Sequence, residues 1–421
     1  MYPVKKAIII GAGPAGLAAA LRLQKSHNIS SVIYELRPTP TTIGGSIGIP
    51  SNGLRLLDRL GVYKPLTQIA NTDERFILHS TTNDAILAES NFSGEAMERI
   101  GYGYMRVKRT DLISCLLDAV QREGTPIHYG KRIVSIDEQD ERVTAKFEDG
   151  TQDTADILLG CDGIHSSVRT MRVDSTLKPE YSGVSAMFSL LRRSELPADS
   201  PPVTCFNSTF TTDGLLAIIS CTASNDEIFW FFSGEVPVPE SGENGWEEHR
   251  HKEVQEFKTS ILNVLGQVQG RWGNFVREVI HRTESISFTP IYRLPLGGTW
   301  SRGRCLLIGD AAHAMQPHAG QGTSMALEDI FVLSHVLKHY PDGSVHDIFS
   351  KYDEVRRPRV TRIYTASEQN GQLWKKTGSW GLWFRENMVW AMFSLASVFG
   401  RKRGVIPLDD LIYDPEEEPI S

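Results

Sequence analysis

The chain has 421 residues, of which 40% are hydrophobic and 23% are charged. This composition predicts a soluble globular protein with two domains, or with one domain that carries a large insertion. A formal net charge of −7 without a long basic block argues against a nucleic-acid partner. Five scattered cysteines without a C-x-x-C pair argue against a disulfide framework or a metal site, and fit a reducing, cytoplasmic location.

The first 35 residues predict a β-α-β unit. An apolar strand over 7–10 and an Ala/Leu-rich helix over 14–25 flank the sequence G-x-G-x-x-G. In such a turn the first glycine allows the sharp bend, the second lets a pyrophosphate approach the backbone, and the third lets helix and strand pack closely. These three glycines are Gly11, Gly13 and Gly16. Glu35 ends the second strand, where a carboxylate can accept bonds from ribose hydroxyls, so the unit predicts a dinucleotide site.

The middle of the chain changes character twice. A Gly-rich loop over 43–49 is followed by a polar, β-like stretch over 73–100, and a helix is predicted over 110–122. Residues 174–290 are rich in aromatic residues and in alternating strands, with one helix over 249–265. A strand-rich region is therefore predicted to be inserted between the parts of the chain that carry cofactor-type motifs.

Two further motifs follow apolar strands in the second half of the chain. Residues 161–169, which contain Asp162, follow one such strand. Residues 307–322 follow another, and there Asp310 is placed to accept a hydrogen bond from a flexible polyol. The Gly-Gln-Gly turn at 320–322 opens a long helix, whose N-terminal N–H groups can face a developing anion.

The tail is predicted to be mainly helical over 352–399 and to end in a loose acidic stretch over 415–419. The uncharged stretch 388–399 is too short to span a bilayer, which needs about 20 residues. The tryptophans of the tail leave three alternatives open: helix packing, a substrate lid, or contact with a membrane surface. Basic residues flank them on both sides: Lys375, Lys376, Arg401, Lys402 and Arg403.

In this order and at these spacings, the three motifs resemble the group A flavin-dependent monooxygenases, the p-hydroxybenzoate hydroxylase-like family, over about residues 5–340. Length and tail look most like the fungal secondary-metabolism and salicylate-hydroxylase-like members. The resemblance implies non-covalent FAD, with NADPH or NADH as a co-substrate that has no Rossmann domain of its own. It also implies that a C4a-hydroperoxide of the flavin delivers one oxygen atom of O2 to a small molecule. The FAD contacts that it implies are Gly11, Gly13, Gly16, Glu35, Gly48, Arg109, Asp162, Asp310, Gly320, Gly322 and Thr323.

The implied fold class is α/β, an FAD-binding Rossmann-type (GR2-like) fold with an inserted mixed β-sheet substrate domain and a helical C-terminal tail. The FAD-binding domain is expected in three parts and the substrate domain in two. In chain order the expected parts are FAD-binding 1–72, substrate 73–100, FAD-binding 101–173, substrate 174–290, FAD-binding 291–360 and the helical segment 361–421.

The chain departs from the family at Phe188, where many members place an arginine on the first substrate-domain strand. This absence disfavours an anionic benzoate-type substrate and favours a largely apolar aromatic or prenylated one. Arg192 lies two pleats beyond Phe188 on the same strand face and could replace the missing arginine. His318, beside the presumed flavin ring, is the second catalytic candidate, whereas His313 is expected to pack or to cap a helix. The predicted substrate pocket comprises Phe188, Phe229, Phe231 and Pro317.

Several alternatives stay open. The reaction could be hydroxylation, epoxidation or Baeyer–Villiger insertion, and the protein a monomer or a homodimer. A flavin-dependent halogenase shares the fold, but its W-x-W-x-I-P sequence is absent. A non-oxygenating FAD-dependent dehydrogenase or reductase acting on a hydrophobic substrate is the main alternative function.

Overall fold

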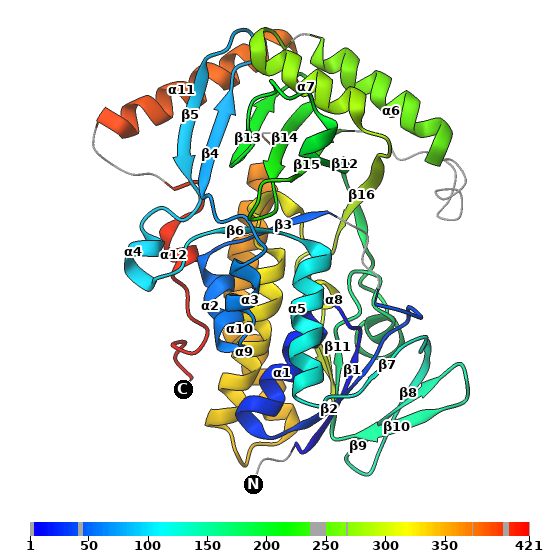
Figure 1. Ribbon diagram of the computed structural model, residues 1–421. Helices are drawn as coiled ribbons and strands as arrows, with labels where there is room; N and C mark the ends of the chain where they lie inside the picture. The colour runs from blue at the N-terminus through cyan, green and yellow to red at the C-terminus, as the bar shows by residue number, and fades with distance from the viewer. Residues whose placement is uncertain are drawn as a thin grey trace.

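A computed structural model describes residues 4–40, 45–235, 250–266, 268–372, 374–398 and 404–420. It consists of two stacked halves (Figure 1). The lower half in that view holds a six-stranded sheet beside a group of helices, and the upper half holds a seven-stranded sheet. Parts of the Gly-rich loop at 43–49 and the basic run at 401–403 lie outside the described residues.

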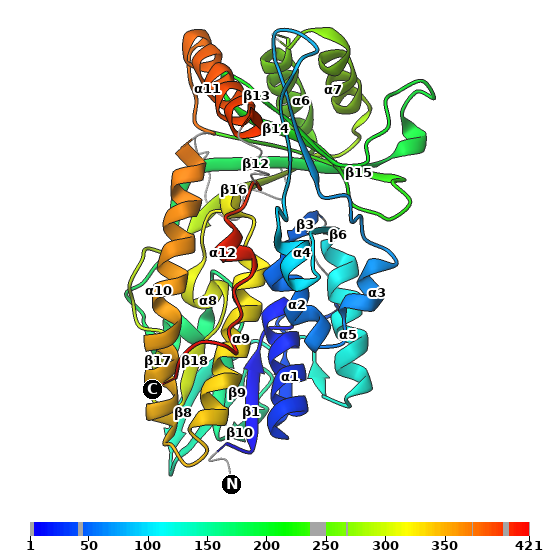
Figure 2. The same cartoon turned by 90° about the vertical axis from the view of Figure 1, so that its left-hand side faces the viewer.

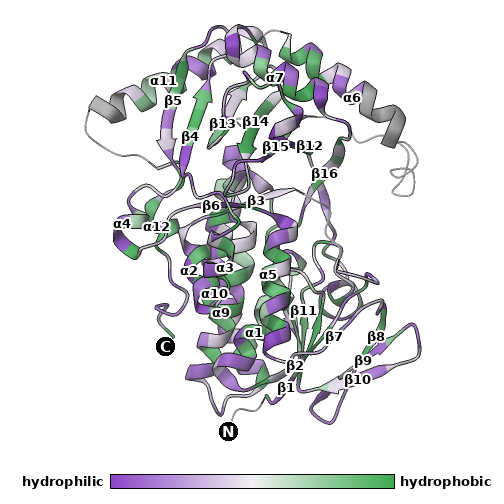
Figure 3. Cartoon of the chain, in the orientation of Figure 1, coloured by the Kyte–Doolittle hydropathy of each residue, from purple (hydrophilic) through white to green (hydrophobic). Residues whose placement is uncertain are grey.

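The six-stranded sheet is parallel except at one edge, where its last two strands are antiparallel. In spatial order it contains β17 (Ser301–Arg302), β18 (Cys305–Leu307), β11 (Ile157–Gly160), β1 (Lys6–Ile10), β2 (Ser30–Tyr34) and β7 (Ile127–His128). β1 lies at the centre, with Ile8 opposite both Leu158 and Val32. Its apolar run is fully buried, as expected for a parallel strand covered on both faces. Figure 3 shows these central strands as largely hydrophobic.

Helices pack around this sheet and connect it to the upper half. The long ones are α1 (Pro14–His27), α5 (Arg109–Arg122), α9 (Gly322–His339) and α10 (Val345–Gln372). α1 contacts both α5 and α9, and α10 runs beside α9 and reaches the upper half (Figure 2). Shorter elements are α2 (Ser51–Arg59), α3 (Tyr63–Thr67), α4 (Ala96–Ile100), η1 (Arg169–Val173), η2 (Arg193–Glu195), α8 (Asp310–His313), η4 (Pro317–Ala319) and α12 (Leu408–Leu411).

The seven-stranded sheet is mixed, because β13 pairs in parallel with β4 while its other neighbours are antiparallel. Its order is β16 (Ser287–Arg293), β12 (Glu180–Arg192), β15 (Glu227–Gly234), β14 (Gly214–Ser220), β13 (Phe206–Phe210), β4 (Arg75–His79) and β5 (Ile86–Asn91). Strands that are far apart in the sequence therefore meet in one sheet. The predicted fold class, α/β with a mixed sheet inserted, is confirmed; the exact domain boundaries stay a prediction.

Two small sheets complete the lower half. One contains β10 (Gln152–Ala155), β9 (Arg142–Phe147) and β8 (Ile133–Gln139); the other pairs β3 (Ser46–Ile49) with β6 (Met105–Lys108). In the second sheet Gly48 lies opposite Arg106. This pairing holds the loop after β2 close to the start of α5, since the N–H of Arg109 donates to the carbonyl oxygen of Gly45 at 2.8 Å.

α11 (Ser379–Val398) packs against one face of the seven-stranded sheet beside β4 and β5. α6 (Arg250–Leu265) and α7 (Gly270–Arg282) cover the opposite, outer face (Figure 2). Side chains of β15 alternate between this side and the interior. Trp230 and Phe232 pack in a core with α6 and α7, whereas Phe229 and Phe231 face the opposite side. The sequence predicted a single helix here and missed α7.

The acidic tail is anchored to the lower half. Asp414 accepts hydrogen bonds from Arg59, at 2.8 Å to its Oδ1, and pairs with Arg55, while Glu416 pairs with Arg22 and Arg59. The prediction of a loose acidic end was therefore wrong. Carboxylates opposite arginines on α1 and α2 fix this segment, and the acidic composition alone did not reveal that pairing.

Candidate active site

A cavity of about 1240 Å³ is lined by elements of both halves. This exceeds the roughly 300–1,000 Å³ that encloses a drug-sized ligand. The cavity therefore has room for a dinucleotide and for a further small molecule beside it. Its two ends differ in the groups that line them.

The Gly-rich turn after β1 forms one end. Gly11 has φ of +105°, and a Cβ there would overlap the carbonyl oxygen of Cys161, so only glycine fits. Gly13 lines the cavity with open space in front of its Cα. Gly16 lies inside α1 against the carbonyl oxygen of Gly11 and does not line the cavity. The N-terminus of α1 thus faces the cavity in the way that pyrophosphate binding requires.

The Glu35 carboxylate lies beside this turn. Its Oε2 accepts the N–H of Ala12 at 2.8 Å and its Oε1 accepts the N–H of Arg37 at 3.0 Å. Lys131 and Arg132 line the same end, where they pair with Asp149 and Glu148. A carboxylate held at the cavity wall in this way can accept ribose hydroxyls.

Asp162 follows β11 and lines the cavity. Its Oδ2 accepts the N–H groups of Ser167 and Val168, at 2.7 and 3.2 Å. Its Oδ1 is buried and has no hydrogen-bond partner among the described residues. Burial raises the pKa of Asp162, while the backbone hydrogen bonds partly oppose the rise. An acceptor that is buried and unpaired at a cavity wall fits a donor of a bound cofactor.

Asp310 is the first residue of α8, directly after β18 and Gly309, and its side chain lines the cavity. Enclosure within the molecule raises the pKa of Asp310, and the nearby charges of His313 and Arg109 oppose that rise. Arg109, the first residue of α5, lines the cavity as well. These residues place a carboxylate and a guanidinium in the middle of the cavity, where a polyol chain would pass.

The turn before α9 closes this end. Gly320 has φ of +62°, and Gly320, Gly322 and Thr323 line the cavity. Thr323 lies in the first turn of α9, so unpaired N–H groups of that turn face the cavity. The positive end of the α9 dipole would stabilise an anion there.

Aromatic rings line the other end. Phe188, Phe229 and Phe231 succeed one another across β12 and β15, with ring centroids 5.7 and 6.1 Å apart. Phe231 continues to Trp374 at 6.2 Å, and Trp374 to His318 at 4.3 Å. Further rings in this wall are Phe76, Phe92, Tyr104, Phe206, Phe210 and Phe393. Such a wall suits an apolar, ring-containing ligand.

Comparison with known proteins settles the family. The model of a family described as "FAD binding domain" matches residues 5–276 and 294–367, which is most of the chain. FAD-dependent monooxygenase penM of Penicillium crustosum is 30% identical over 86% of this chain and 77% of its own length. The chain belongs to the group A flavin-dependent monooxygenases. It is thus an FAD-dependent oxidoreductase, as the motifs predicted.

Bacterial relatives and solved structures agree with this assignment. 6-Hydroxynicotinate 3-monooxygenase of Pseudomonas fluorescens is 29% identical over 89% of this chain and 93% of that protein. The fold matches a salicylate hydroxylase substrate complex with a TM-score of 0.74 at 22% identity, covering 98% of this chain and 96% of that one. Klebsiella pneumoniae HpxO with FAD and uric acid matches at a TM-score of 0.78 and 20% identity, covering 97% and 96%.

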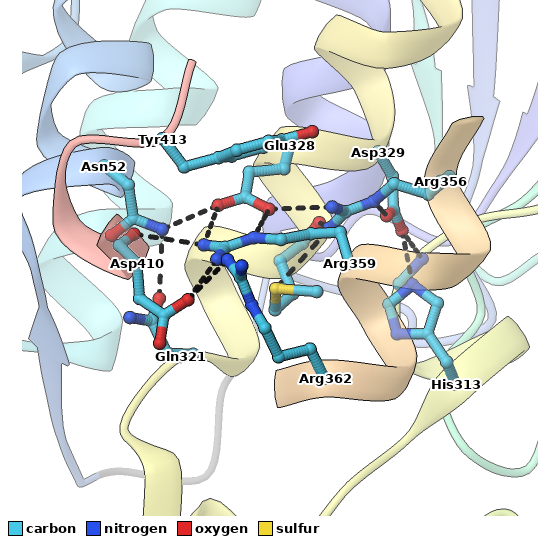
Figure 4. Close-up of polar contacts among 12 residues, drawn as sticks. Asn52, His313, Gln321, Glu328, Asp329, Arg356, Arg359, Arg362, Asp410 and Tyr413 are labelled. Atoms are coloured by element: carbon cyan, nitrogen blue, oxygen red, sulfur yellow. Dashed lines mark hydrogen bonds and ion pairs between the residues drawn. The ribbon is translucent and has the colours of Figure 1, made fainter. Parts of the chain in front are cut away.

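Behind the FAD end of this monooxygenase lies a buried ionic network (Figure 4). Arg356 of α10 donates to Asp329 at 2.6 Å and to Glu328 at 2.8 Å, and Arg359 donates to Glu328 and to Asp410. Burial alone would raise the pKa of Asp329, but His313 and Arg356 hold it below its ordinary value. Each carboxylate in the network thus has an arginine beside it.

The network reaches the FAD end through hydrogen bonds. Asn52 donates to Glu328 at 2.7 Å and to Gln321 at 3.0 Å, and Gln321 lies in the turn before α9. His313 lies 2.8 Å from Asp329 and stabilises this arrangement, so its role is structural. Asp410 connects the same network to the C-terminal segment, which the sequence did not suggest.

His318 lies on η4, between the two ends of the cavity. It is 8% exposed, and neither of its ring nitrogens has a hydrogen-bond partner among the described residues. Burial lowers the pKa of His318 to about 4, so the imidazole is neutral at neutral pH. Pro317 lines the cavity beside it. A neutral imidazole can donate one hydrogen bond and accept another.

Other lining residues were missed from the sequence. Tyr104 and Arg106 reach the cavity because β6 pairs with β3, and the Tyr104 hydroxyl occupies the space that a side chain at Gly48 would need. Burial raises the pKa of Tyr104 to about 12. The tail adds Val389, Met392, Phe393 and residues 404–407. The aromatic content of the tail suggested that its helix contributes to the site, but no local sequence signal indicated that residues 404–407 do.

The suggestion that Arg192 replaces the missing pocket arginine was wrong. Arg192 lies at the exposed end of β12, opposite Glu227, and does not line the cavity. The alternation of the strand placed it correctly on the face of Phe188, but the strand extends past the cavity wall before it reaches Arg192.

Proposed function

We propose that this monooxygenase is a single-component enzyme that takes electrons from NAD(P)H and inserts one atom of O2 into a mostly apolar aromatic or prenylated small molecule, by hydroxylation or epoxidation. One observation carries the proposal: a single continuous cavity joins the dinucleotide end to the aromatic end. A reaction that needs flavin and substrate in contact requires this arrangement. Substrates of this kind are typical of secondary metabolism, where we place the reaction.

The residues at the first end fit FAD. Gly13 and the start of α1 would hold its pyrophosphate, Glu35 its ribose, and Asp310 its ribityl chain, with Asp162 and Arg109 beside it. Gly48, Gly320, Gly322 and Thr323 would border the flavin ring. Bound FAD supplies the redox chemistry, accepting a hydride from the nicotinamide and passing electrons to O2. The chain contributes orientation and a cavity that excludes water.

The substrate class follows from the aromatic wall. Phe188 occupies the position where an arginine would hold a carboxylate, and the ring contacts continue from it to Trp374. Arg106 lies in this region but is fully buried; its Nε and Nη2 donate to Ser220, Asn71 and Asp73, while its Nη1 has no hydrogen-bond partner among the described residues. Contact with such a wall contributes about 25 cal/mol per Å² of apolar area buried, which suffices for binding without an ion pair.

His318 would orient the substrate. It would exchange a hydrogen bond with an oxygen or nitrogen atom of the substrate, because no described residue satisfies either of its ring nitrogens. Since its pKa lies near 4, it acts as a neutral group and not as a cation for a carboxylate. It is therefore a positioning residue in this proposal.

The test uses purified protein, NADPH or NADH, and ¹⁸O2 with a panel of apolar aromatic and prenylated compounds. We expect substrate-stimulated NAD(P)H oxidation and a product that carries one ¹⁸O atom. A product formed equally well without O2 would instead identify a dehydrogenase or reductase. Preference for benzoate-type acids over neutral compounds of the same ring size would overturn the substrate class alone.

A further inference from the structure

The outer face of α11 exposes a continuous set of large apolar side chains. Trp380 is 85% exposed, Phe384 65%, Trp383 57% and Trp390 52%. At 3.6 residues per turn, these positions and Met388 all fall on one half of the helix circumference. Isolated exposed apolar residues are common on protein surfaces, but a contiguous patch of this kind marks an interaction site.

The opposite side of α11 is built into the protein. Leu382 and Val389 are buried against β4, β13 and β14. Glu386 is buried too, and accepts hydrogen bonds from the N–H and hydroxyl of Thr81 at 2.8 and 2.7 Å. The helix is therefore fixed in orientation, and the tryptophans face outward because the inner side is already occupied.

Charge distinguishes this segment from the remainder of the chain. Residues 374–404 contain six lysines and arginines and one acidic residue, Glu386, which gives +5. The whole chain carries −7, so the remainder carries −12. Glu386 is buried on the inner side, so no acidic residue of 374–404 faces outward. Of the basic residues, Lys376 pairs with Asp213 at 3.1 Å, and the Arg385 guanidinium packs over the Phe210 ring, so the outward face carries only part of this charge. Arg401, Lys402 and Arg403 are included in this charge count from the sequence alone, because they lie outside the described residues.

The structure assigns this face to a membrane surface: we infer that α11 lies in the plane of an anionic bilayer, with Trp380, Trp383 and Phe384 inserted at the headgroup level. Tryptophans with flanking basic residues are typical of helices that lie in that interface. None of the helices within the described residues is long and apolar enough to cross a bilayer, so the contact is peripheral.

The inner side of α11 connects the membrane contact to the substrate end of the cavity. Val389, Met392 and Phe393 line the cavity, so one helix separates the bilayer from the aromatic wall. An apolar substrate dissolved in the membrane would then be taken up beside α11. This role rests on the proposed function, whereas the membrane contact does not.

The test is flotation of the full-length, FAD-loaded protein with vesicles of phosphatidylcholine containing about 30% phosphatidylserine, compared with phosphatidylcholine alone. We expect binding to the anionic vesicles, about tenfold weaker in a Trp380→Ser/Trp383→Ser variant. A control is Val134→Ser/Leu296→Ser, which removes two apolar side chains elsewhere that are 47% and 45% exposed, and it should bind like the parent.

Other outcomes overturn the assignment. Failure of the parent to float with anionic vesicles, or equal flotation of the tryptophan variant, would refute it. A concentration-dependent dimer in light scattering that the tryptophan variant loses would give the face to a second copy instead. Without vesicles, all three proteins should turn over detergent-dispersed substrate at the same rate. If the parent shows no turnover under these conditions, that result counts against the proposed function and not against the membrane contact.

Discussion

At one end of the cavity the lining consists mainly of backbone and charged side chains, and at the other end of aromatic rings. The FAD end comes from turns that each follow a strand of one parallel sheet, at Gly11, Asp162 and Asp310. The aromatic end comes from β4, β12, β13, β15, α11 and the segment 404–407. The first end is assembled by local geometry, the second by contacts between distant parts of the chain.

This difference predicts which residues of the cavity can be substituted without loss of FAD binding. Carboxyl ends of parallel strands meet at one edge, so a charge there is placed by the sheet itself. The aromatic wall depends on side-chain size, so a single ring in it can be altered without changing the FAD motifs. Variants of the first end should therefore lose FAD, whereas variants of the second end should lose substrate affinity and coupling.

The largest effect is expected from the network that supports the FAD end. Arg356→Met would leave Glu328 and Asp329 buried without one of their arginines. Removing one partner of a buried pair costs about 3–5 kcal/mol. Urea unfolding should show this loss of free energy of unfolding. Arg362→Met is the control, because the Arg362 side chain is 54% exposed and its pair with Asp410 should contribute less than about 1 kcal/mol. Equal losses in the two variants would contradict the account of the network.

The second prediction concerns FAD retention. Glu35→Ala and Asp310→Ala each remove a carboxylate from the FAD end, and a charge-assisted hydrogen bond contributes about 1.5–3 kcal/mol. The Kd for FAD should rise by about 10- to 100-fold in each, as measured by fluorescence titration. Glu284→Ala removes an exposed carboxylate from the other half and should retain FAD like the parent. Unchanged retention in both test variants would mean that the cofactor lies elsewhere.

The residues of the three sequence motifs line one end of the cavity, and their contact with FAD stays a prediction; of the aromatic end the sequence named only a part. Each FAD motif is a contiguous run in which strand, turn and helix follow one another, so the pattern is visible locally. Tyr104 and Arg106 were not predicted as lining residues, because their position depends on the pairing of β6 with β3, which has no local sequence signal. The alternation of β15 did separate Phe229 and Phe231 from Trp230. The anchoring of the acidic tail could not be predicted, since its arginine partners lie more than 350 residues away in the chain.

The third prediction addresses the aromatic end. Phe393→Ala would open the wall that α11 contributes, without touching the FAD motifs. We expect normal FAD retention, a rise in substrate KM of about tenfold, and more hydrogen peroxide per NAD(P)H consumed, because water then reaches the reacting centre. Met388→Ala, on the outer side of the same helix, is the matched control and should couple oxygen transfer normally. Normal coupling in Phe393→Ala would remove α11 from the substrate site.

The smallest effect distinguishes His318 from an ordinary buried histidine. Burial lowers the pKa of both His318 and His27 to about 4, from 6.5 in the unfolded chain. Between pH 6.5 and 4 the unfolded chain thus binds more protons than the folded one, and stability falls as the pH is lowered. Each histidine should cost about 2 kcal/mol at pH 4.5 relative to pH 8. Urea unfolding of His318→Asn and of His27→Asn should therefore show a shallower loss of stability toward acid than the parent.

Only one of these two variants should affect catalysis. His27 is bonded to Ser334 between α1 and α9 and does not line the cavity. His318 does line it, and neither of its nitrogens has a hydrogen-bond partner in the part of the chain that the structure describes. His318→Asn should raise the substrate KM several-fold while the pH dependence of kcat near neutrality stays unchanged, because the imidazole is already neutral there. A change in KM for both variants would reflect general loosening of the fold. A lost ionisation near pH 6.5 in the kcat profile of His318→Asn alone would show that the residue acts as an acid or base, and would end its assignment as a neutral positioning group.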